Sequence, residues 1–332
     1  MLILRRPDVA ETLAGREQEI IDLVAEAYRL HDEGRTALPH SIFLRFPEEE
    51  HRRDRIIGLP AYRGGESPVA GMKWIASFPG NVAAGMERAS ATVVLNSLET
   101  GRPTAFLEGS VISAKRTAAS AALAARVLTE QAPPTGMTLV GCGVINLEVL
   151  RFVKAALPGL REATLHDMDP ARAEAFARTC AEAVPGVRVS VAGGLDEALA
   201  AHPLLALATT AAEPHLDLSA CAPGTTVLHV SLRDLTVETI LGAVNVVDDA
   251  DHVCRERTSL HLAEQRTGSR DFIAAPIGAL LRGTERVERA PGQHVIYSPF
   301  GLGVLDIALA EYVREQAERA GLGVRVEGFL ES

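Results

Sequence analysis

The sequence is poor in several residue types that mark particular classes of protein. Aromatic residues make up only 4% of its 332 residues, and its four cysteines, Cys142, Cys180, Cys221 and Cys254, form no Cys-x-x-Cys motif. Cysteines spaced so widely are typical of reduced thiols rather than of a disulfide framework. The ten histidines are scattered as well, and none stands at a recognised ligand spacing. We therefore expect no bound metal and a cytoplasmic location.

The chain also lacks long apolar runs and an excess of positive charge. No apolar segment reaches the ~20 residues that a membrane span needs. The apolar start, Met1 to Leu4, is followed at once by Arg5 and Arg6, which argues against a signal peptide. The formal net charge of −10 argues against a nucleic-acid surface. A local basic pocket for an acidic metabolite is compatible with that charge.

The residues in abundance favour an α/β fold. The hydrophobic fraction is 47%, which is ample for a buried core, and 332 residues are comfortable for two domains. Between residues 135 and 297, short apolar strands alternate with helical segments, a pattern typical of a Rossmann-type doubly wound parallel sheet. The strands expected there are 138–140, 163–167, 187–191, 204–209, 226–230 and 245–247.

The flanking parts of the chain have a different pattern, which predicts an α+β domain. We expect an amphipathic helix over 15–34, strand-like runs and then an Ala-rich helix from about 113 to 128. A helix from about 301 to 320 is expected to pack back on this part. Residues 1–134 together with 298–332 are thus predicted to form one domain, and 135–297 the other. The strand-like runs of the first part are 55–62, 69–78, 91–96 and 104–108.

A glycine turn indicates a dinucleotide site. The strand Thr138–Val140 runs directly into Gly141-Cys142-Gly143, and a predicted helix follows. The first glycine permits a tight turn, and the second lets a pyrophosphate approach the helix N-terminus, where free N–H groups favour anions. Asn146 stands where the strict motif has a third glycine. An ordinary strand–helix turn is the alternative, but the strand–turn–helix context is the one that supports the motif.

An acidic residue after the next strand predicts the type of nicotinamide cofactor. Asp167 lies within the ~20-residue range at which a carboxylate binds the ribose hydroxyls. A carboxylate there repels a 2′-phosphate, which favours NAD over NADP. Asp169 is an alternative contact, and both residues could instead cap the helix that begins at Pro170.

Three of the cations that precede the predicted dinucleotide domain are candidates for a binding site. Lys73 lies in an otherwise apolar strand, Arg88 follows in Glu87-Arg88-Ala89, and Arg116 is expected in the first turn of a helix, where a cation opposes the helix dipole. A single lysine or arginine of this kind is more often a solvated surface charge than a binding residue. Together, in an apolar context, they predict a carboxylate-binding pocket.

Several stretches together resemble the ornithine cyclodeaminase/mu-crystallin family over nearly the whole chain. The resemblance implies a homodimer formed through the first part, with an inserted dinucleotide domain, and a substrate carboxylate held by Lys73 and Arg116. The stretches that carry it are GMKWIASFPGN, ETGRPTAFLEG, SAKRTAASAALAA, GCGVIN and GLGVLDIALA.

The sequence departs from the ornithine cyclodeaminase branch near the substrate. The catalytic Asp of that branch has no clear counterpart in Ser231-Leu232-Arg233-Asp234, and Arg88 stands where the branch has a Thr. Another branch is matched more fully, through PHSIFLRF, KWIASFP, ERAS, LEGSVISAKRTAAS, VSLRDL and SPFGLGVLD. Its members oxidise N-(2-amino-2-carboxyethyl)-L-glutamate with NAD⁺ to L-2,3-diaminopropionate and 2-oxoglutarate, for siderophores and peptide antibiotics.

The resemblance and the residues together define the predicted site. A small anionic amino-acid substrate with three carboxylates needs extra cations, and Arg45, Arg88 and Arg233 are the candidates beside Lys73 and Arg116. Asp234 would position the amine or the attacking water, although an ion pair with Arg233 and a helix cap are the alternative. Lys73, Arg116 and Asp234 are the predicted catalytic residues. The predicted cofactor contacts are Thr117, Gly141, Gly143, Val144, Ile145, Asn146, Asp167, Thr209, Ser231 and Gly301.

Three other activities are compatible with the same sequence. An ornithine-type cyclodeaminase would convert ornithine to proline and ammonia with no net NADH. A mu-crystallin-like protein would only bind a small ligand. An imine or ketimine reductase would work in the opposite direction.

Overall fold

A computed structural model describes residues 1–51 and 54–330 of the chain. They form two compact units: unit 1, Met1–Arg116 with Leu302–Ser332, and unit 2, Thr117–Gly301. The chain passes from unit 1 to unit 2 within helix α3 (Ser110–Leu128) and returns after Gly301. The sequence analysis predicted that the chain would cross between the two domains after residue 134 and again after residue 297. The first crossing lies at Arg116, earlier than predicted, because α3 is one continuous helix whose first turns belong to unit 1.

Unit 1 is built on an eight-stranded, mostly antiparallel sheet. The strand order is β16-β1-β7-β6-β5-β4-β2, with β3 also paired to β4. The four strand-like runs expected from the sequence correspond to β4 to β7, and the short strands β1, β2, β3 and β16 were not expected. The bounds are β1 Leu2–Leu4, β2 Thr36–Ala37, β3 Ile42–Arg45, β4 Arg55–Arg63, β5 Val69–Ser77, β6 Ala89–Asn96, β7 Pro103–Glu108 and β16 Val324–Arg325.

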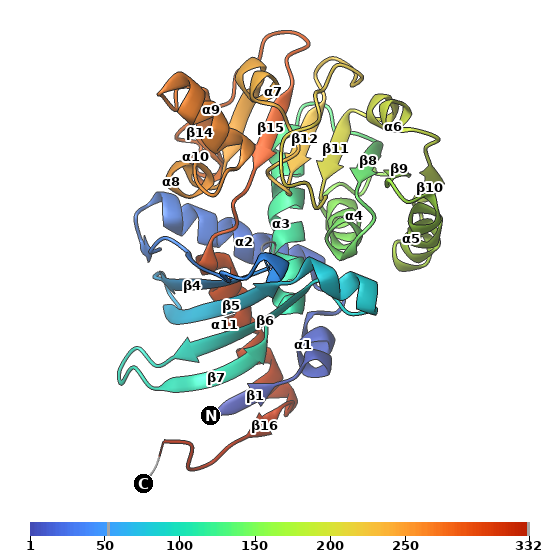
Figure 1. Ribbon diagram of the computed structural model, residues 1–332. Helices are drawn as coiled ribbons and strands as arrows, with labels where there is room; N and C mark the ends of the chain where they lie inside the picture. The colour runs from blue at the N-terminus through green and yellow to red at the C-terminus, as the bar shows by residue number, and fades with distance from the viewer. Residues whose placement is uncertain (52–53, 331–332) are drawn as a thin grey trace. The chain divides into compact units, whose positions relative to one another are not determined.

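Helices cover one face of this sheet. Helix α11 (Gly303–Ala320) packs on β4, β5 and β6 and on α2 (Glu17–Asp32), and α1 (Arg6–Leu13) packs beside it (Figure 1). The expected packing of the last helix on the first part is therefore confirmed. Gly303 allows the close approach, because a Cβ there would lie 3.0 Å from the Leu59 carbonyl oxygen. Two short 3-10 helices, Glu49–His51 and Pro79–Ala84, complete the unit.

Unit 2 contains an eight-stranded, wholly parallel sheet in the order β10-β9-β8-β11-β12-β15-β13-β14 (Figure 1). The order reverses between β8 and β11, as it does in Rossmann folds, so the predicted fold class is confirmed. The sequence did not predict β14 and β15. The bounds are β8 Gly136–Val140, β9 Glu162–His166, β10 Arg188–Val191, β11 Leu204–Leu207, β12 Thr226–His229, β13 Val244–Val247, β14 Ile273–Pro276 and β15 Val295–Ser298.

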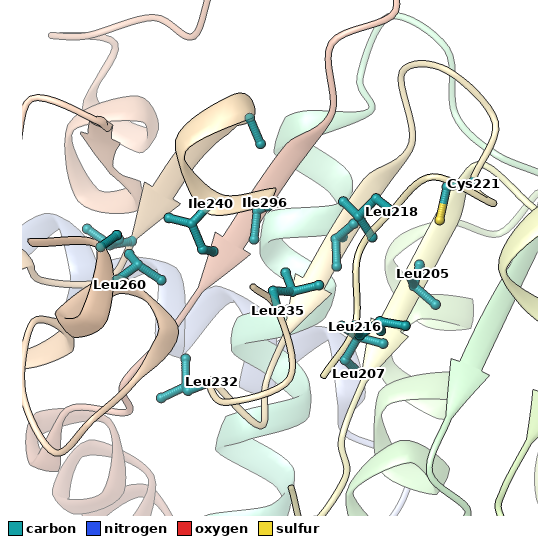
Figure 2. Packing of buried hydrophobic residues seen from close by; sticks show 14 of the residues in the cluster. Leu205, Leu207, Leu216, Leu218, Cys221, Leu232, Leu235, Ile240, Leu260 and Ile296 are labelled. Carbon is teal, nitrogen blue, oxygen red and sulfur yellow. The ribbon is translucent and has the colours of Figure 1, made fainter. Parts of the chain in front are cut away.

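Helices connect most of the consecutive strands of unit 2, and β11 and β12 are joined without one. Helices α4, α5 and α6 contact the half of the sheet that contains β8 to β11. A buried cluster that begins at β11 and continues into the rest of the sheet includes Leu205, Leu207, Leu232, Leu235 and Ile296 (Figure 2). The helix bounds are α4 Val144–Ala156, α5 Pro170–Ala183, α6 Leu195–Ala201, α7 Val237–Gly242, α8 Ala250–Val253, α9 Ser259–Thr267 and α10 Ile277–Arg282.

The cysteines do not form disulfides, and the described helices do not include a membrane span. All four cysteines are buried free thiols, and burial raises the pKa of the Cys142 and Cys180 thiols to about 12. Among the helices described in residues 1–51 and 54–330, none combines the length and the apolar character that a membrane crossing requires.

Candidate active site

Three charged side chains meet in the interior of unit 1. Lys73 Nζ lies 2.7 Å from one carboxylate oxygen of Asp306, and Arg116 Nε donates to the other at 3.0 Å. Lys73 also donates to Ser113 Oγ at 3.1 Å. The Lys73 and Asp306 side chains are 2% and 0% exposed, and that of Arg116 is 9% exposed. We call Lys73, Arg116 and Asp306 the buried charge cluster.

The buried charge cluster carries an excess of positive charge. Two cations share one carboxylate, so its formal charge is +1 when all three groups are ionised. Burial and the neighbouring Arg116 guanidinium lower the pKa of Lys73 to about 8, although Asp306 opposes the shift. A buried unpaired charge is costly. An anionic group from a ligand is the complement that this cluster needs.

Each member of the cluster is placed by its own element. Lys73 is on the face of β5 that α11 covers, whereas its neighbours Met72 and Trp74 are on the opposite face, as strand alternation requires. Asp306 lies in the first turn of α11. The sequence placed Arg116 in the first turn of its helix, which was wrong because α3 begins at Ser110. The ion pair with Asp306, not the helix dipole, accounts for Arg116.

The sequence missed Asp306, although a signal was present. It is the single charged residue in Gly301-Leu-Gly-Val-Leu-Asp-Ile-Ala-Leu-Ala, a stretch whose other residues are buried. A carboxylate in so apolar a helix requires a buried partner. The partners themselves are 190 or more residues away along the chain, and nothing local identifies them.

The two other cations predicted in unit 1 lie apart from this cluster. Arg88 is largely buried directly before β6 and donates to Ser77 Oγ at 2.6 Å; burial lowers its pKa. Arg45 is exposed at the end of β3, and its guanidinium carbon lies 5.6 Å from the centre of the Phe43 ring. No contact is recorded between either arginine and the buried charge cluster in the described part of the chain.

The glycine turn of unit 2 has the geometry of an anion site at a helix N-terminus. Gly141 has φ 95°, and a Cβ there would lie 2.4 Å from the Ala208 carbonyl oxygen, so the position requires glycine. Gly143 is the N-cap of the 13-residue helix α4 and provides no side-chain cap. A Cβ at Gly143 would meet nothing within 4 Å. The first turn of α4 thus has no side-chain cap, and the space beside Gly143 is open.

Other predicted cofactor residues support this turn. Asn146 is fully buried, and its side-chain amide donates to the carbonyl oxygens of Val140 and Gly141 at 2.9 and 2.7 Å. Asp167 follows β9 and accepts from the Cys142 N–H at 2.9 Å. Asp169 is the N-cap of α5 and accepts from Ala171 N–H. The helix-cap interpretation thus holds for Asp169, whereas Asp167 lies against the glycine turn.

A second group of predicted residues gathers beside the reversal of strand order. Thr209 follows β11 and Ser231 follows β12, and both hydroxyls donate to the carboxylate of Asp234. The backbone N–H of Asp234 donates to His229 Nε2 at 3.3 Å, and its carboxylate lies 3.4 Å from the same atom. We call Thr209, His229, Ser231 and Asp234 the Asp234 cluster.

The Asp234 cluster is a closed hydrogen-bond network. Burial raises the pKa of the Asp234 carboxyl, but the contacts with His229, Ser231 and Thr209 outweigh it and lower the pKa to about 2. His229 is fully buried and was missed by the sequence; its Nδ1 lies 3.2 Å from Ser298 Oγ. Thr236, not Asp234, caps α7. The helix cap that was the alternative role for Asp234 is therefore filled by another residue.

The remaining predicted residues are placed as follows. Arg233 donates to the Glu256 carbonyl oxygen at 2.7 Å. Gly301 is buried with φ 93°, and its N–H donates to Asp248 at 2.7 Å. Thr117 lies in α3, and Val144 and Ile145 begin α4. In residues 1–51 and 54–330, no group of three or more His, Cys, Asp or Glu side chains is arranged to hold a metal ion.

This architecture and these motifs recur in a known group of proteins. The sequence model of the ornithine cyclodeaminase/mu-crystallin family matches residues 2–321. The chain belongs to this family.

Its relatives include dehydrogenases and reductases of amino acids. The N-((2S)-2-amino-2-carboxyethyl)-L-glutamate dehydrogenase of Staphylococcus aureus is 28% identical over 327 residues, which cover 97% of each chain. An archaeal alanine dehydrogenase, solved as a dimer with bound NAD, has a TM-score of 0.87 and 25% identity and covers 99% of each chain. The Δ1-pyrroline-2-carboxylate reductase of Thermococcus litoralis, solved with NADH and L-proline, has a TM-score of 0.89 at 24% identity; the match covers 98% of this chain and all of that one.

Proposed function

We propose that this protein is an NAD-dependent dehydrogenase that oxidises an amino acid at a CH–NH group. Its proposed substrate is N-(2-amino-2-carboxyethyl)-L-glutamate, and the products are L-2,3-diaminopropionate and 2-oxoglutarate. The observation that carries the proposal is the buried charge cluster, in which two cations share the single carboxylate of Asp306. A substrate carboxylate neutralises the remaining positive charge, and guanidinium and ammonium groups are the donors suited to it.

The glycine turn fits the cofactor of the proposed reaction. The uncapped N–H groups at the start of α4 would bind the pyrophosphate, and the open space at Gly143 admits it. The Asp167 carboxylate would bind the adenine-side ribose hydroxyls and exclude a 2′-phosphate. NAD⁺ supplies a hydride acceptor when it is bound. The chain itself supplies binding, orientation and proton transfer.

The proposed reaction balances in two steps. In the first, hydride leaves the α-carbon of the glutamate portion and the amine loses a proton, which leaves a substrate imine. In the second, water adds to the imine carbon and the C–N bond breaks, giving the amine of diaminopropionate and the ketone of 2-oxoglutarate. Lys73, whose pKa is lowered to about 8, is suited to accept and return these protons near neutral pH. Arg116 holds the carboxylate.

Asp234 has a different proposed role. Both of its carboxylate oxygens already accept hydrogen bonds from the hydroxyls of Thr209 and Ser231. With a pKa of about 2, it is a poor general base near neutral pH. We therefore propose that Asp234 is a positioning residue, which fixes Thr209 and Ser231 at the carboxyl ends of β11 and β12, where ligands of open α/β sheets bind.

A homodimer through unit 1 is part of the proposal. The face of the unit 1 sheet opposite α11 is apolar and exposed, and the strand register aligns Met72 with Pro60 and Val94, and Val94 with Phe106. Met72 and Trp74 are 36% and 40% exposed there, and Ile42 is 64% exposed. An apolar sheet face of this kind marks an interaction surface, and its occupant is proposed to be the same face of a second copy. Trp74→Glu should then yield monomers in sedimentation at micromolar concentration, whereas a monomeric wild type refutes this assembly.

The activity is tested with NAD⁺ and candidate amino acids. The conjugate should give net NADH by absorbance, with diaminopropionate and 2-oxoglutarate identified by mass spectrometry. Ornithine converted to proline and ammonia without net NADH would establish the cyclodeaminase instead. Absence of turnover with every amino acid, despite NAD⁺ binding, would contradict both enzymatic activities. Faster turnover with NADP⁺ than with NAD⁺ would contradict the role of Asp167.

A further inference from the structure

The parallel sheet of unit 2 contains the strand order of two mononucleotide-binding halves. In space, β10, β9 and β8 form one half and β11, β12 and β15 form the other, and the order reverses between them (Figure 1). Asp167, the proposed contact of the adenine-side ribose, follows β9 in the first half. On the proposed function, the nicotinamide half of the cofactor therefore belongs at the carboxyl ends of β11, β12 and β15.

Buried polar side chains join the ends of these three strands. Thr209 follows β11 and Ser231 follows β12, and their hydroxyls donate to the carboxylate of Asp234. His229 is the last residue of β12, and its Nε2 lies 3.4 Å from the same carboxylate. Its Nδ1 lies 3.2 Å from Oγ of Ser298, the last residue of β15. The two ring nitrogens of His229 thus contact groups at two neighbouring strand ends.

A second carboxylate holds the segment that follows Ser298. Asp248 directly follows β13, which pairs with β15, and its side chain is buried. One carboxylate oxygen accepts from the Phe300 N–H at 2.9 Å, and the other accepts from the Gly301 N–H at 2.7 Å. The first oxygen also accepts from the Asp249 N–H at 2.9 Å. We call the following four side chains the carboxyl-edge network: Asp234, His229, Ser298 and Asp248.

The carboxyl-edge network is buried, but the residues that it holds reach the surface. His229 and Ser298 are 0% exposed, so they act through their neighbours rather than by contact with a ligand. Ser231, on one side of His229 in the network, and Phe300, on the other side, are partly exposed. A buried hydrogen-bond network whose groups are satisfied makes the backbone around it rigid.

We propose that His229 is a positioning residue for the nicotinamide half of the NAD site. It joins the carboxylate of Asp234 to the hydroxyl of Ser298. The partly exposed residues Ser231 and Phe300, which follow neighbouring strands, therefore keep a fixed separation before the cofactor arrives, and this lowers the entropic cost of binding. The inference rests on the proposed function and deepens it, because it assigns the order of one half of the cofactor site to one buried side chain.

The test compares NAD⁺ with ADP, which contains the adenine half and two phosphates but no nicotinamide half. Ser298→Ala and His229→Gln should each weaken NAD⁺ binding in calorimetry about tenfold, the effect of one lost buried hydrogen bond. Neither should change the affinity for ADP. The double variant should lose no more than either single variant, because both remove the same contact. His229→Asn places its amide close to the position of Nδ1, so it should bind NAD⁺ more tightly than His229→Gln.

Thr225→Val is the matched control. Thr225 is fully buried directly before β12, at the opposite edge of the sheet, and its hydroxyl donates to the Ala222 carbonyl oxygen at 2.7 Å. This variant should lower stability in urea unfolding and leave both affinities unchanged. An equal weakening of ADP and NAD⁺ in the His229 and Ser298 variants, which a purely structural role would produce, overturns the proposal. An unchanged affinity for NAD⁺, or additive losses in the double variant, also overturns it.

The binding measurements also separate this inference from the proposed function, because they require no turnover. If the variants lose NAD⁺ affinity selectively but the wild type oxidises no amino acid, the proposed function fails and the role of His229 stands. If the wild type oxidises an amino acid with NAD⁺ but the loss in the variants is not selective, the role of His229 fails and the proposed function stands.

Discussion

The two units each bury a carboxylate completely, and they satisfy it in opposite ways. Asp306 in unit 1 is shared by two cations, Lys73 and Arg116, so positive charge remains. Asp234 in unit 2 is satisfied by the hydroxyls of Thr209 and Ser231 and by His229, with no Lys or Arg ion pair recorded among the described residues. Both side chains are 0% exposed, so burial alone does not distinguish a reactive group from a structural one.

The two networks differ in whether they require an additional anionic group. The buried charge cluster is complete only with an added anion, and it holds the pKa of Lys73 at about 8, in a range useful for proton transfer. The Asp234 cluster needs nothing further and holds its carboxylate ionised at all but very acidic pH. We infer that unit 1 supplies the proton chemistry and that the Asp234 cluster supplies rigidity. The following predictions test that comparison.

The largest effect is expected from Lys73→Met. Removing a general acid–base typically costs on the order of 10²–10⁴-fold in turnover, so kcat should fall by that amount. Lys154→Met is the control, because Lys154 donates only to the carbonyl oxygens of Pro158 and Leu160. A variant of Lys73 that retains wild-type kcat would refute the assignment of proton transfer to unit 1.

The pH profile checks the same assignment independently. Lys73 must be neutral to accept a proton, so kcat for oxidation should rise as pH increases through about 8. The same shift affects stability: the folded pKa lies below the ordinary value of 10.5, so the unfolded chain binds more protons between these values. The contribution of Lys73 to stability therefore increases with pH across that window, which urea unfolding of wild type and Lys73→Met at several pH values would detect.

Asp306→Asn should be the most destabilising of the carboxylate replacements. It leaves two buried cations without a counterion, and breaking such a buried pair costs about 3–5 kcal/mol. Urea unfolding measures the loss. The double variant Lys73→Met with Asp306→Asn should recover part of it, because the ammonium that lacks a partner is gone. A loss in Asp306→Asn no larger than that in Asp234→Asn would remove the distinction between the two units.

An effect of intermediate size is expected when the charge at the proposed cofactor site of unit 2 is changed. Asp167→Ala combined with Met168→Arg removes a carboxylate and adds a cation where the ribose is proposed to bind. We expect the ratio of kcat/KM for NAD⁺ to that for NADP⁺ to fall about tenfold to a hundredfold, from the loss or gain of charge-assisted bonds. Met168 is almost fully exposed, so Met168→Arg alone serves as a control for stability. An unchanged ratio in the double variant would contradict the role of Asp167.

The smallest effect is expected from Asp234→Asn. The amide retains the shape of the carboxylate and some of its hydrogen bonds, so the loss should be about 1–3 kcal/mol. The folded pKa of Asp234 is about 2, below its ordinary 3.8; its contribution is present above the ordinary value and is lost as pH falls towards 2. Acid unfolding should thus be less steep in Asp234→Asn. A variant with normal stability but abolished kcat would make Asp234 catalytic instead.

Local sequence patterns predicted the longer elements and the glycine turn of unit 2. The alternation of β5 and the helical periodicity of α2 are properties of neighbouring residues, and the glycine turn between β8 and α4 requires Gly141 because of its left-handed backbone. Asp167 could be found because it follows the next strand of the same unit. Element boundaries were less certain, and the early start of α3 moved Arg116 out of the first turn.

The buried charge cluster of unit 1 was decided only by the tertiary structure. Asp306 meets Lys73 and Arg116 because α11 packs across the unit 1 sheet, and this contact joins residues far apart in the chain. Sequence determines which side chains are charged and which face of an element they occupy. Whether a charge finds a partner depends on packing between distant elements, which no local pattern specifies.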